Sequence, residues 1–297
     1  MKRVVAHIGD PFVLTASDGK YYMYCTNHVE IGGYNVWSSS DLENWTLDGQ
    51  CFKKSDTNWC YKDFWAPEVI EYNNRFYMFY TAREKSTDLL KIGVAVSDKP
   101  TGPFIDEKNK PLLDIDYAII DASVLVDEDK IYMYYSRDCS TNIIDGIHRS
   151  DIYAIELDDN FDPISEPLFL FHPTQEWETN PLEKDFLWNE GPSVIKVGDF
   201  YYMTYSANPF WSVKYSVGVA TSHSPLGPFN KDTNNPVLAS ELEKGISGPG
   251  HNSIFKSHDG TKIYIAYHVH HDPNVGGGDR DAIISEVIFK DGTMNLI

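Results

Sequence analysis

A six-residue pattern of aromatic and aliphatic residues occurs five times along this chain of 297 residues. The copies begin at Tyr21, Phe76, Ile131, Tyr201 and Ile263, 55 to 70 residues apart, and each follows a short polar turn sequence. Residues of high β propensity placed directly after a turn are typical of the second strand of a hairpin. The sequence therefore predicts five similar hairpins, one after another.

Further strands flank every copy of this pattern. A short apolar segment ending in Val or Ile precedes each copy, as at 10–13 and 191–194, and a third segment follows, as at 217–220. Five units of three or four antiparallel strands, with almost no helical periodicity, predict an all-β, five-bladed β-propeller that forms a single domain over residues 1–297. A β-sandwich of similar hairpins is the alternative, and the even spacing disfavours it.

The net charge indicates which partners the protein can bind, and the cysteines indicate the cellular compartment in which it works. The formal net charge is −19, and no basic run is present that could neutralise phosphates, so we expect no nucleic-acid partner. No segment approaches the length of a membrane span, and the first residues lack the apolar part of a signal peptide. The four cysteines show no CxxC spacing, which favours a reducing compartment. We expect a cytoplasmic protein, or a secreted one if an export signal has been removed.

The innermost strand of each propeller blade lines a central channel, so equivalent residues of different blades face one another. At or just before this strand the copies carry Asp10, Asp121, Glu190 and His251, and the second copy has Ala66. Carboxylates crowded in a partly dry cavity are costly, and chemistry is the usual reason to keep them. Two carboxyl groups across a pocket suit glycoside hydrolysis, in which one protonates the leaving oxygen and the other stays ionised.

Aromatic side chains near the same strand ends suit a sugar, whose C–H faces need apolar platforms. Phe12, Trp65, Phe210 and Trp211 lie at such positions. Trp65 has blade packing as its alternative role. The repeated Tyr-Met-Tyr strands, by contrast, are expected to form the core between blades, since every blade has one. Strand alternation predicts that Glu68 faces elsewhere.

Five short motifs, taken in chain order, resemble glycoside hydrolase family 43. They are Asp-Pro at 10–11, Phe-Trp-Ala-Pro-Glu at 64–68, Asp-Ala-Ser at 121–123, Glu-Gly-Pro-Ser at 190–193 and Gly-His-Asn at 250–252. The resemblance runs from about residue 7 to the end. It implies a five-bladed propeller that acts on arabinose- and xylose-containing glycans with inversion. It also implies that Asp10 is the general base, Glu190 the general acid, and Asp121 a third acid that orients Glu190 and adjusts its pKa.

The resemblance implies roles for two further residues. His251 would lie on the channel axis, contact the substrate and help to hold a structural calcium ion, usually through water. Arg280 would contact a substrate hydroxyl, and a salt bridge with Asp279 or Asp281 is its alternative. No cofactor is required for the chemistry. The spacing of His268, His270 and His271 is weak support for zinc, because no partner carboxylate is apparent in the sequence.

The sequence thus predicts a glycosidase whose partner is an arabinose- or xylose-containing oligosaccharide or polysaccharide. An α-L-arabinofuranosidase is the first choice. A β-xylosidase, an endo-1,5-α-L-arabinanase and a non-catalytic carbohydrate-binding propeller remain as alternatives. Insertions at 143–148, 172–188 and 210–214 are expected to shape the mouth of the site and to favour a closed pocket that releases single sugars. The oligomeric state stays open.

Overall fold

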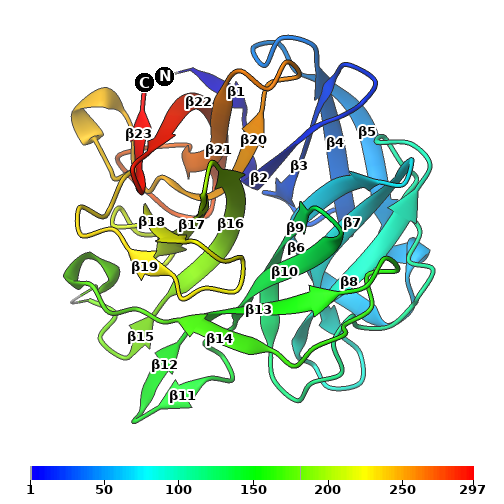
Figure 1. The fold of residues 1–297 in the computed structure, drawn as a ribbon, viewed down its shortest axis with the longest axis horizontal. Coiled ribbons are helices and arrows are strands. Elements are labelled where there is room, and N and C mark those ends of the chain that lie inside the picture. Colours follow the sequence, from blue (N-terminus) through cyan, green and yellow to red (C-terminus); the bar gives the residue numbers. More distant parts are fainter. Residues whose placement is uncertain (1, 181) are drawn as a thin grey trace.

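The computed structural model describes residues 2–180 and 182–297. Five antiparallel sheets are arranged around a common centre (Figure 1). The first contains β2 (Ile8–Thr15), β3 (Tyr21–Asn27), β4 (Gly33–Ser39) and β5 (Thr46–Lys53), and the second β6 (Cys60–Tyr72), β7 (Arg75–Glu84) and β8 (Leu90–Ser97). The third contains β9 (Ile119–Asp127), β10 (Lys130–Arg137), β13 (Asp151–Leu157) and β14 (Leu168–Phe171).

The remaining two sheets complete the set of blades. The fourth contains β16 (Asn189–Val197), β17 (Phe200–Ala207), β18 (Ser216–Ser222) and β19 (Asn230–Lys231). The fifth contains β20 (Gly250–Lys256), β21 (Ile263–His270) and β22 (Arg280–Lys290), to which β1 (Arg3–Val5) and β23 (Thr293–Leu296) add. The predicted five-bladed propeller is confirmed.

Helical structure is confined to single turns. Three 3₁₀ turns occur, η1 (Lys54–Asp56), η2 (Glu176–Glu178) and η3 (Leu242–Lys244), and the described residues contain no α-helix. None of the helical segments in the described part of the chain has the length and apolarity that crossing a bilayer requires.

The ring is closed by strands from both ends of the chain. The innermost strands β2, β6, β9, β16 and β20 pack each against the next, and β20 packs against β2. On the far side of the last blade, β1 pairs with β22, with Arg3 opposite Ile283. β23 also pairs with β22, so the first and last strands of the described chain lie in one sheet (Figure 1). The pairing of β1 with β22 joins the start of the chain to its last blade by backbone hydrogen bonds.

The repeated strands form the core, as the sequence predicts. The third residue of four copies, Met23, Met78, Met133 and Met203, has no exposed surface. Most tyrosines of the same strands are buried as well, whereas Tyr77 and Tyr264 are partly exposed. All four cysteines are free thiols, and three of them are buried.

Every innermost strand carries a β-bulge at the same point. The pairing register with the second strand shifts there in all five blades. The residue at the bulge has a left-handed backbone: φ is 53° at Asp10, 42° at Ala66, 59° at Asp121, 57° at Gly191 and 40° at His251. Such a conformation is uncommon for residues other than glycine and persists only where the surroundings impose it. Because bulges redirect side chains, these five points determine what faces the axis.

A small additional sheet projects from the rim of the third and fourth blades (Figure 1). It consists of β11 (Ile143–Ile144), β12 (Ile147–Arg149) and β15 (Phe186–Leu187). Two of the three predicted insertions thus combine into one element, in which β12 and β15 run parallel.

Candidate active site

A cavity of about 370 Å³ gathers most of the residues that the sequence singles out. Its wall contains the three predicted acids together with predicted contact residues, namely Asp10, Asp121, Glu190, Trp65, Phe210, His251 and Arg280. Trp211, also noted in the sequence, is there too. Carboxyl groups from three different blades therefore face one shared pocket.

Asp10 lies at the bulge of β2 beside a guanidinium group. Arg280 Nη1 donates a hydrogen bond to Asp10 Oδ1 at 2.7 Å. Burial opposes ionisation of Asp10, but the positive charge of Arg280 and the contacts with His251 and His268 outweigh it, so that the pKa of Asp10 lies well below its ordinary value. Asp10 is thus a buried carboxylate.

Glu190 lies in the opposite electrostatic environment. Burial, followed by the negative charges of Asp121 and Asp138, raises the pKa of Glu190 well above its ordinary value. The hydroxyl of Ser150 donates a hydrogen bond to Glu190 Oε1 at 3.0 Å. The protonated form of Glu190 is therefore favoured by its surroundings, and the hydroxyl of Ser150 is a neutral partner.

Asp121 is a third buried carboxyl group, and its pKa is also raised. Burial raises its pKa to about 6; His251 works against this shift and Asp10 adds to it. The backbone N–H of Gly191 donates to Asp121 Oδ2 at 3.2 Å. Since Gly191 directly follows Glu190, this bond ties the third acid to the segment that carries Glu190.

The bulge residues are held by a repeated bond between blades. In four blades the last residue of the six-residue pattern accepts a hydrogen bond from the bulge N–H of the next blade. These bonds join Thr26 to Ala66 (2.8 Å), Thr81 to Asp121 (3.1 Å), Ser206 to His251 (2.8 Å) and His268 to Asp10 (3.1 Å). The fifth equivalent, Ser136, has a buried hydroxyl without a hydrogen-bond partner among the described residues. In the fourth blade the bulge N–H, that of Gly191, donates its hydrogen bond to Asp121 instead.

The position before each bulge forms a second row around the axis. Glu190 belongs to this row and Gly191 to the bulge row, so Glu190 is equivalent to Trp65 and not to Asp10. Glycines occupy the row in the first and last blades because large side chains fill the space. A Cβ on Gly9 would lie 2.1 Å from Arg280 Cζ, and one on Gly250 would lie 2.1 Å from a ring carbon of Tyr215.

Aromatic rings form the wall of the pocket nearest the small rim sheet. Phe186 of β15 stacks on Trp188, with ring centroids 5.5 Å apart, and Trp188 meets Trp211 edge-on at 6.1 Å. Trp211 is 47% exposed. The hairpin at 143–148 does not itself line the pocket, but its His148 stacks on Phe186 at 4.6 Å. The insertions therefore shape the mouth as predicted, mainly through 172–188 and 210–214.

Several pocket residues escaped the sequence analysis. Among them are Asp138, Phe186, Trp188 and Tyr215. Phe186 and Trp188 lie within the predicted insertion at 172–188, and this was the available indication. Asp138 follows the third repeat by two residues and would have been found only by extending each repeat past its sixth position.

Two predictions about side-chain direction need correction. Phe12 is absent from the pocket wall and lines a smaller cavity of about 20 Å³ on the axis, so we withdraw its predicted contact with the substrate. Glu68 lines this axial cavity as well, where Val124 N–H donates to its Oε1 at 2.7 Å and burial raises its pKa to about 8. The expectation for Glu68 misapplied strand alternation, because residues two apart, such as Ala66 and Glu68, lie on the same face, and both line this cavity.

The protein groups around His251 would supply only part of the ligand set of a calcium ion, so water would have to supply the rest. Calcium takes six to eight oxygen ligands, whereas His251 brings one imidazole, whose Nδ1 is 3.6 Å from Asp10 Oδ1. Within the described ranges, His251 belongs to no cluster of three metal-ligating side chains. The axial cavity below it has room for about one water molecule.

A propeller whose central pocket holds two carboxyl groups with opposite pKa shifts, beside aromatic side chains, fits the class of glycoside hydrolases. The chain is a member of glycosyl hydrolases family 43, whose family model matches residues 4–294. It is 43% identical to a thermostable family-43 glycoside hydrolase of known structure, with a TM-score of 0.92 over 98% of this chain and 93% of that one.

Other relatives differ in the activity that their names state. A structure named endo-1,4-beta-xylanase from Bacteroides thetaiotaomicron is 31% identical, with a TM-score of 0.85 over 100% of this chain and 96% of that one. A probable arabinan endo-1,5-alpha-L-arabinosidase A of Aspergillus flavus is 27% identical over 91% of this chain and 80% of its own length.

Proposed function

We propose that this chain is an inverting glycosidase that releases single pentose units, α-L-arabinofuranose first, from plant cell-wall oligosaccharides and polysaccharides. The observation that carries the proposal is the opposite pKa shifts of Asp10 and Glu190 within one pocket. A pair of carboxyl groups whose environments drive their pKa values apart suits acid and base roles. We infer that residues 1–297 act as one catalytic domain.

In this proposal Glu190 gives its proton to the glycosidic oxygen as that bond breaks. Asp10 takes a proton from a water molecule that attacks the anomeric carbon from the other face, which inverts the configuration. Asp121 keeps Glu190 protonated through its charge and fixes the Glu190–Gly191 segment through the Gly191 N–H. Arg280 keeps Asp10 ionised, and Trp65 and Phe210 serve as platforms for the sugar ring.

We favour action on chain ends over action within chains, because Phe186, Trp188 and Trp211 line one side of the pocket. An extracellular exo-α-(1→5)-L-arabinofuranosidase of Cellvibrio japonicus, 25% identical over 91% of this chain, is among the relatives. β-Xylosidase activity is the second candidate, because the same acid pair serves either pentose. The third is endo-1,5-α-L-arabinanase, favoured by a neighbouring cavity of about 280 Å³ that shares Trp65, Phe210 and Arg280 with the pocket.

Kinetics with two kinds of leaving group test the assignment of acid and base. A good leaving group needs no protonation, so Glu190→Gln should slow hydrolysis of arabino-oligosaccharides by about 10²- to 10⁴-fold and a dinitrophenyl arabinofuranoside far less. Asp10→Asn should slow both substrates strongly. Equal losses on both substrates in Glu190→Gln would contradict the acid role. No turnover in the parent protein would favour a non-catalytic, carbohydrate-binding propeller.

Product analysis by NMR identifies the sugar, the linkage and the anomer in one experiment. The first product from arabino-oligosaccharides should be the β-anomer of arabinose, released singly. The predicted calcium ion beside His251 is a separate question, since the proposed chemistry needs no cofactor. If kcat and Tm are the same before and after EDTA treatment, the calcium prediction is wrong.

A further inference from the structure

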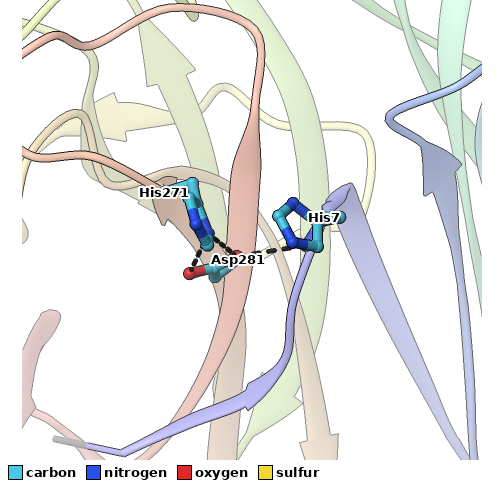
Figure 2. Close-up of side chains that lie close together, drawn as sticks. All are labelled: His7, His271 and Asp281. Carbon is cyan, nitrogen blue, oxygen red and sulfur yellow. Dashed lines mark hydrogen bonds and ion pairs between the residues drawn. The ribbon is translucent and has the colours of Figure 1, made fainter.

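Three histidines and two aspartates meet where the start of the chain joins the last blade. His7 lies between β1 and β2, His28 follows β3, and His271 follows β21, while Asp279 and Asp281 lie at the start of β22. Figure 2 shows His7 and His271 directed toward Asp281 from different segments of the chain. None of the five lines the substrate pocket.

The contacts within this group are short. His271 Nδ1 lies 2.8 and 3.0 Å from the two carboxylate oxygens of Asp281. His7 Nδ1 lies 3.0 Å from Asp279 Oδ2, and its ring centroid is 4.4 Å from that of His271. One ligand atom from each of His7, His271 and Asp281 can be chosen so that all lie within 4.8 Å of one another.

The burial of the group suits an ion that arrives from solvent. The side chains of His7 and His271 are 58% and 42% exposed, whereas that of Asp281 is 2% exposed. Asp281 is held in place by the His7 backbone N–H at 3.1 Å and by Arg3. A fixed, buried carboxylate therefore lies beneath two partly exposed imidazoles, one of which already contacts it.

We propose that His7, His271 and Asp281 form a surface site for a divalent transition metal, with Zn²⁺ as the preferred ion. Two imidazoles and a carboxylate with an open position are a ligand set that zinc accepts, whereas calcium and magnesium take oxygen ligands. Asp279 supplies a second carboxylate beside His7. Arg3 already neutralises part of the charge on Asp281, so we expect weaker binding than at a carboxylate without a counter-charge.

The site changes how the sequence pattern of histidines is interpreted. His271 belongs to the group whose zinc role seemed weak for want of a carboxylate, and the structure supplies Asp281 across the β21–β22 hairpin. The other imidazole comes from His7, 264 positions earlier in the chain. A bound ion would therefore link the first segment to the last blade, next to the β1–β22 pairing that closes the ring.

A ligand that binds only the folded state stabilises it in proportion to the logarithm of its concentration. Zn²⁺ at about 100-fold above its Kd should raise the Tm by several degrees. The effect requires no substrate, so it can be measured whether or not the proposed hydrolysis is correct.

The test is titration of ZnCl₂ into protein freed of metal by EDTA and dialysis, followed by calorimetry and by thermal unfolding. We expect one Zn²⁺ per chain and a rise in Tm. His271→Ala and His7→Asn should each weaken binding at least tenfold and abolish the rise; asparagine suits position 7 because it tolerates the left-handed backbone there, where φ is 60°. His223→Ala, which removes an exposed histidine outside the group, should bind Zn²⁺ as the parent does.

Three outcomes would overturn the proposal. The first is the absence of binding by the parent, and the second is unchanged affinity in both variants. The third is an equal rise in Tm with CaCl₂, which would point to an oxygen-ligated ion elsewhere. A variant that is less stable without metal still answers the question, because calorimetry at a temperature well below its Tm measures the affinity of the folded protein.

Discussion

A methyl group added at Gly9 should push the guanidinium of Arg280 away from Asp10, although neither Arg280 nor Asp10 is itself replaced. The Cβ of Gly9→Ala would lie 2.1 Å from Arg280 Cζ, whereas ordinary contact begins at 3.4 Å, so the guanidinium must move by at least roughly 1.3 Å. A shift of that size breaks the 2.7 Å bond from Arg280 Nη1 to Asp10. A hydrogen bond to a charged group is worth about 1.5–3 kcal/mol. We therefore expect kcat/KM to fall roughly 10- to 150-fold.

The pH profile of Gly9→Ala gives a second readout. Arg280 is the largest of the influences that lower the pKa of Asp10, so its displacement should raise that pKa and move the acid limb of kcat/KM to higher pH. Gly278→Ala is the matched control, because its Cβ would lie 3.9 Å from the nearest atom and neither glycine has a left-handed φ. A loss smaller than about threefold with an unmoved acid limb would refute the reasoning.

Three more changes follow from the same contacts. Asp138→Asn removes one of the charges that raise the pKa of Glu190, so the basic limb of kcat/KM should move to lower pH; a profile identical to that of the parent would contradict this. Trp211 lies at the exposed mouth of the pocket, where we expect the sugar units beyond the cleaved bond to lie. Trp211→Ala should therefore raise KM several-fold for oligosaccharides and hardly at all for an aryl pentoside. Equal increases for both substrates would contradict a contact between Trp211 and those further sugar units. In chemical denaturation, Thr81→Val should lower the free energy of unfolding by about 1–3 kcal/mol because a buried N–H loses its acceptor. Ser136→Ala, which removes a hydroxyl without a described partner, should cost much less, and similar losses in the two variants would be the contrary result.

The blades could be predicted from the sequence because each strand is encoded locally. Hydrophobic hexapeptides after polar turns specify hairpins wherever they occur, and five copies leave few ways to arrange them. The positions of Asp10, Asp121 and Glu190 in one pocket follow from that arrangement. The β-bulges themselves could not be predicted, because no residue type marks the left-handed position. Asp, Ala, Gly and His all occupy the bulge.

The rest of the pocket could not be predicted because it lies outside the repeat. Trp188 and Phe186 belong to an insertion whose position is set by pairing of β15 with β12. Asp138 is placed by its backbone N–H, which donates to the Ala118 carbonyl at 2.9 Å. Ser150 reaches Glu190 only because the third blade packs against the fourth. Each of these placements depends on tertiary contacts that no window of the sequence contains.

The chemistry of this pocket arises where the fivefold pattern is broken. Asp10 and Glu190 lie in different rows of the innermost strands and next to different neighbours. The glycine at position 9 admits the Arg280 guanidinium to Asp10, whereas the fourth blade has a side chain, Glu190, in the equivalent place and faces the acids of the third blade. Where the other blades use the bulge N–H as a structural bond, Gly191 gives it to Asp121. A propeller with identical blades would hold identical carboxyl groups with one common pKa, and it would have no distinct acid and base.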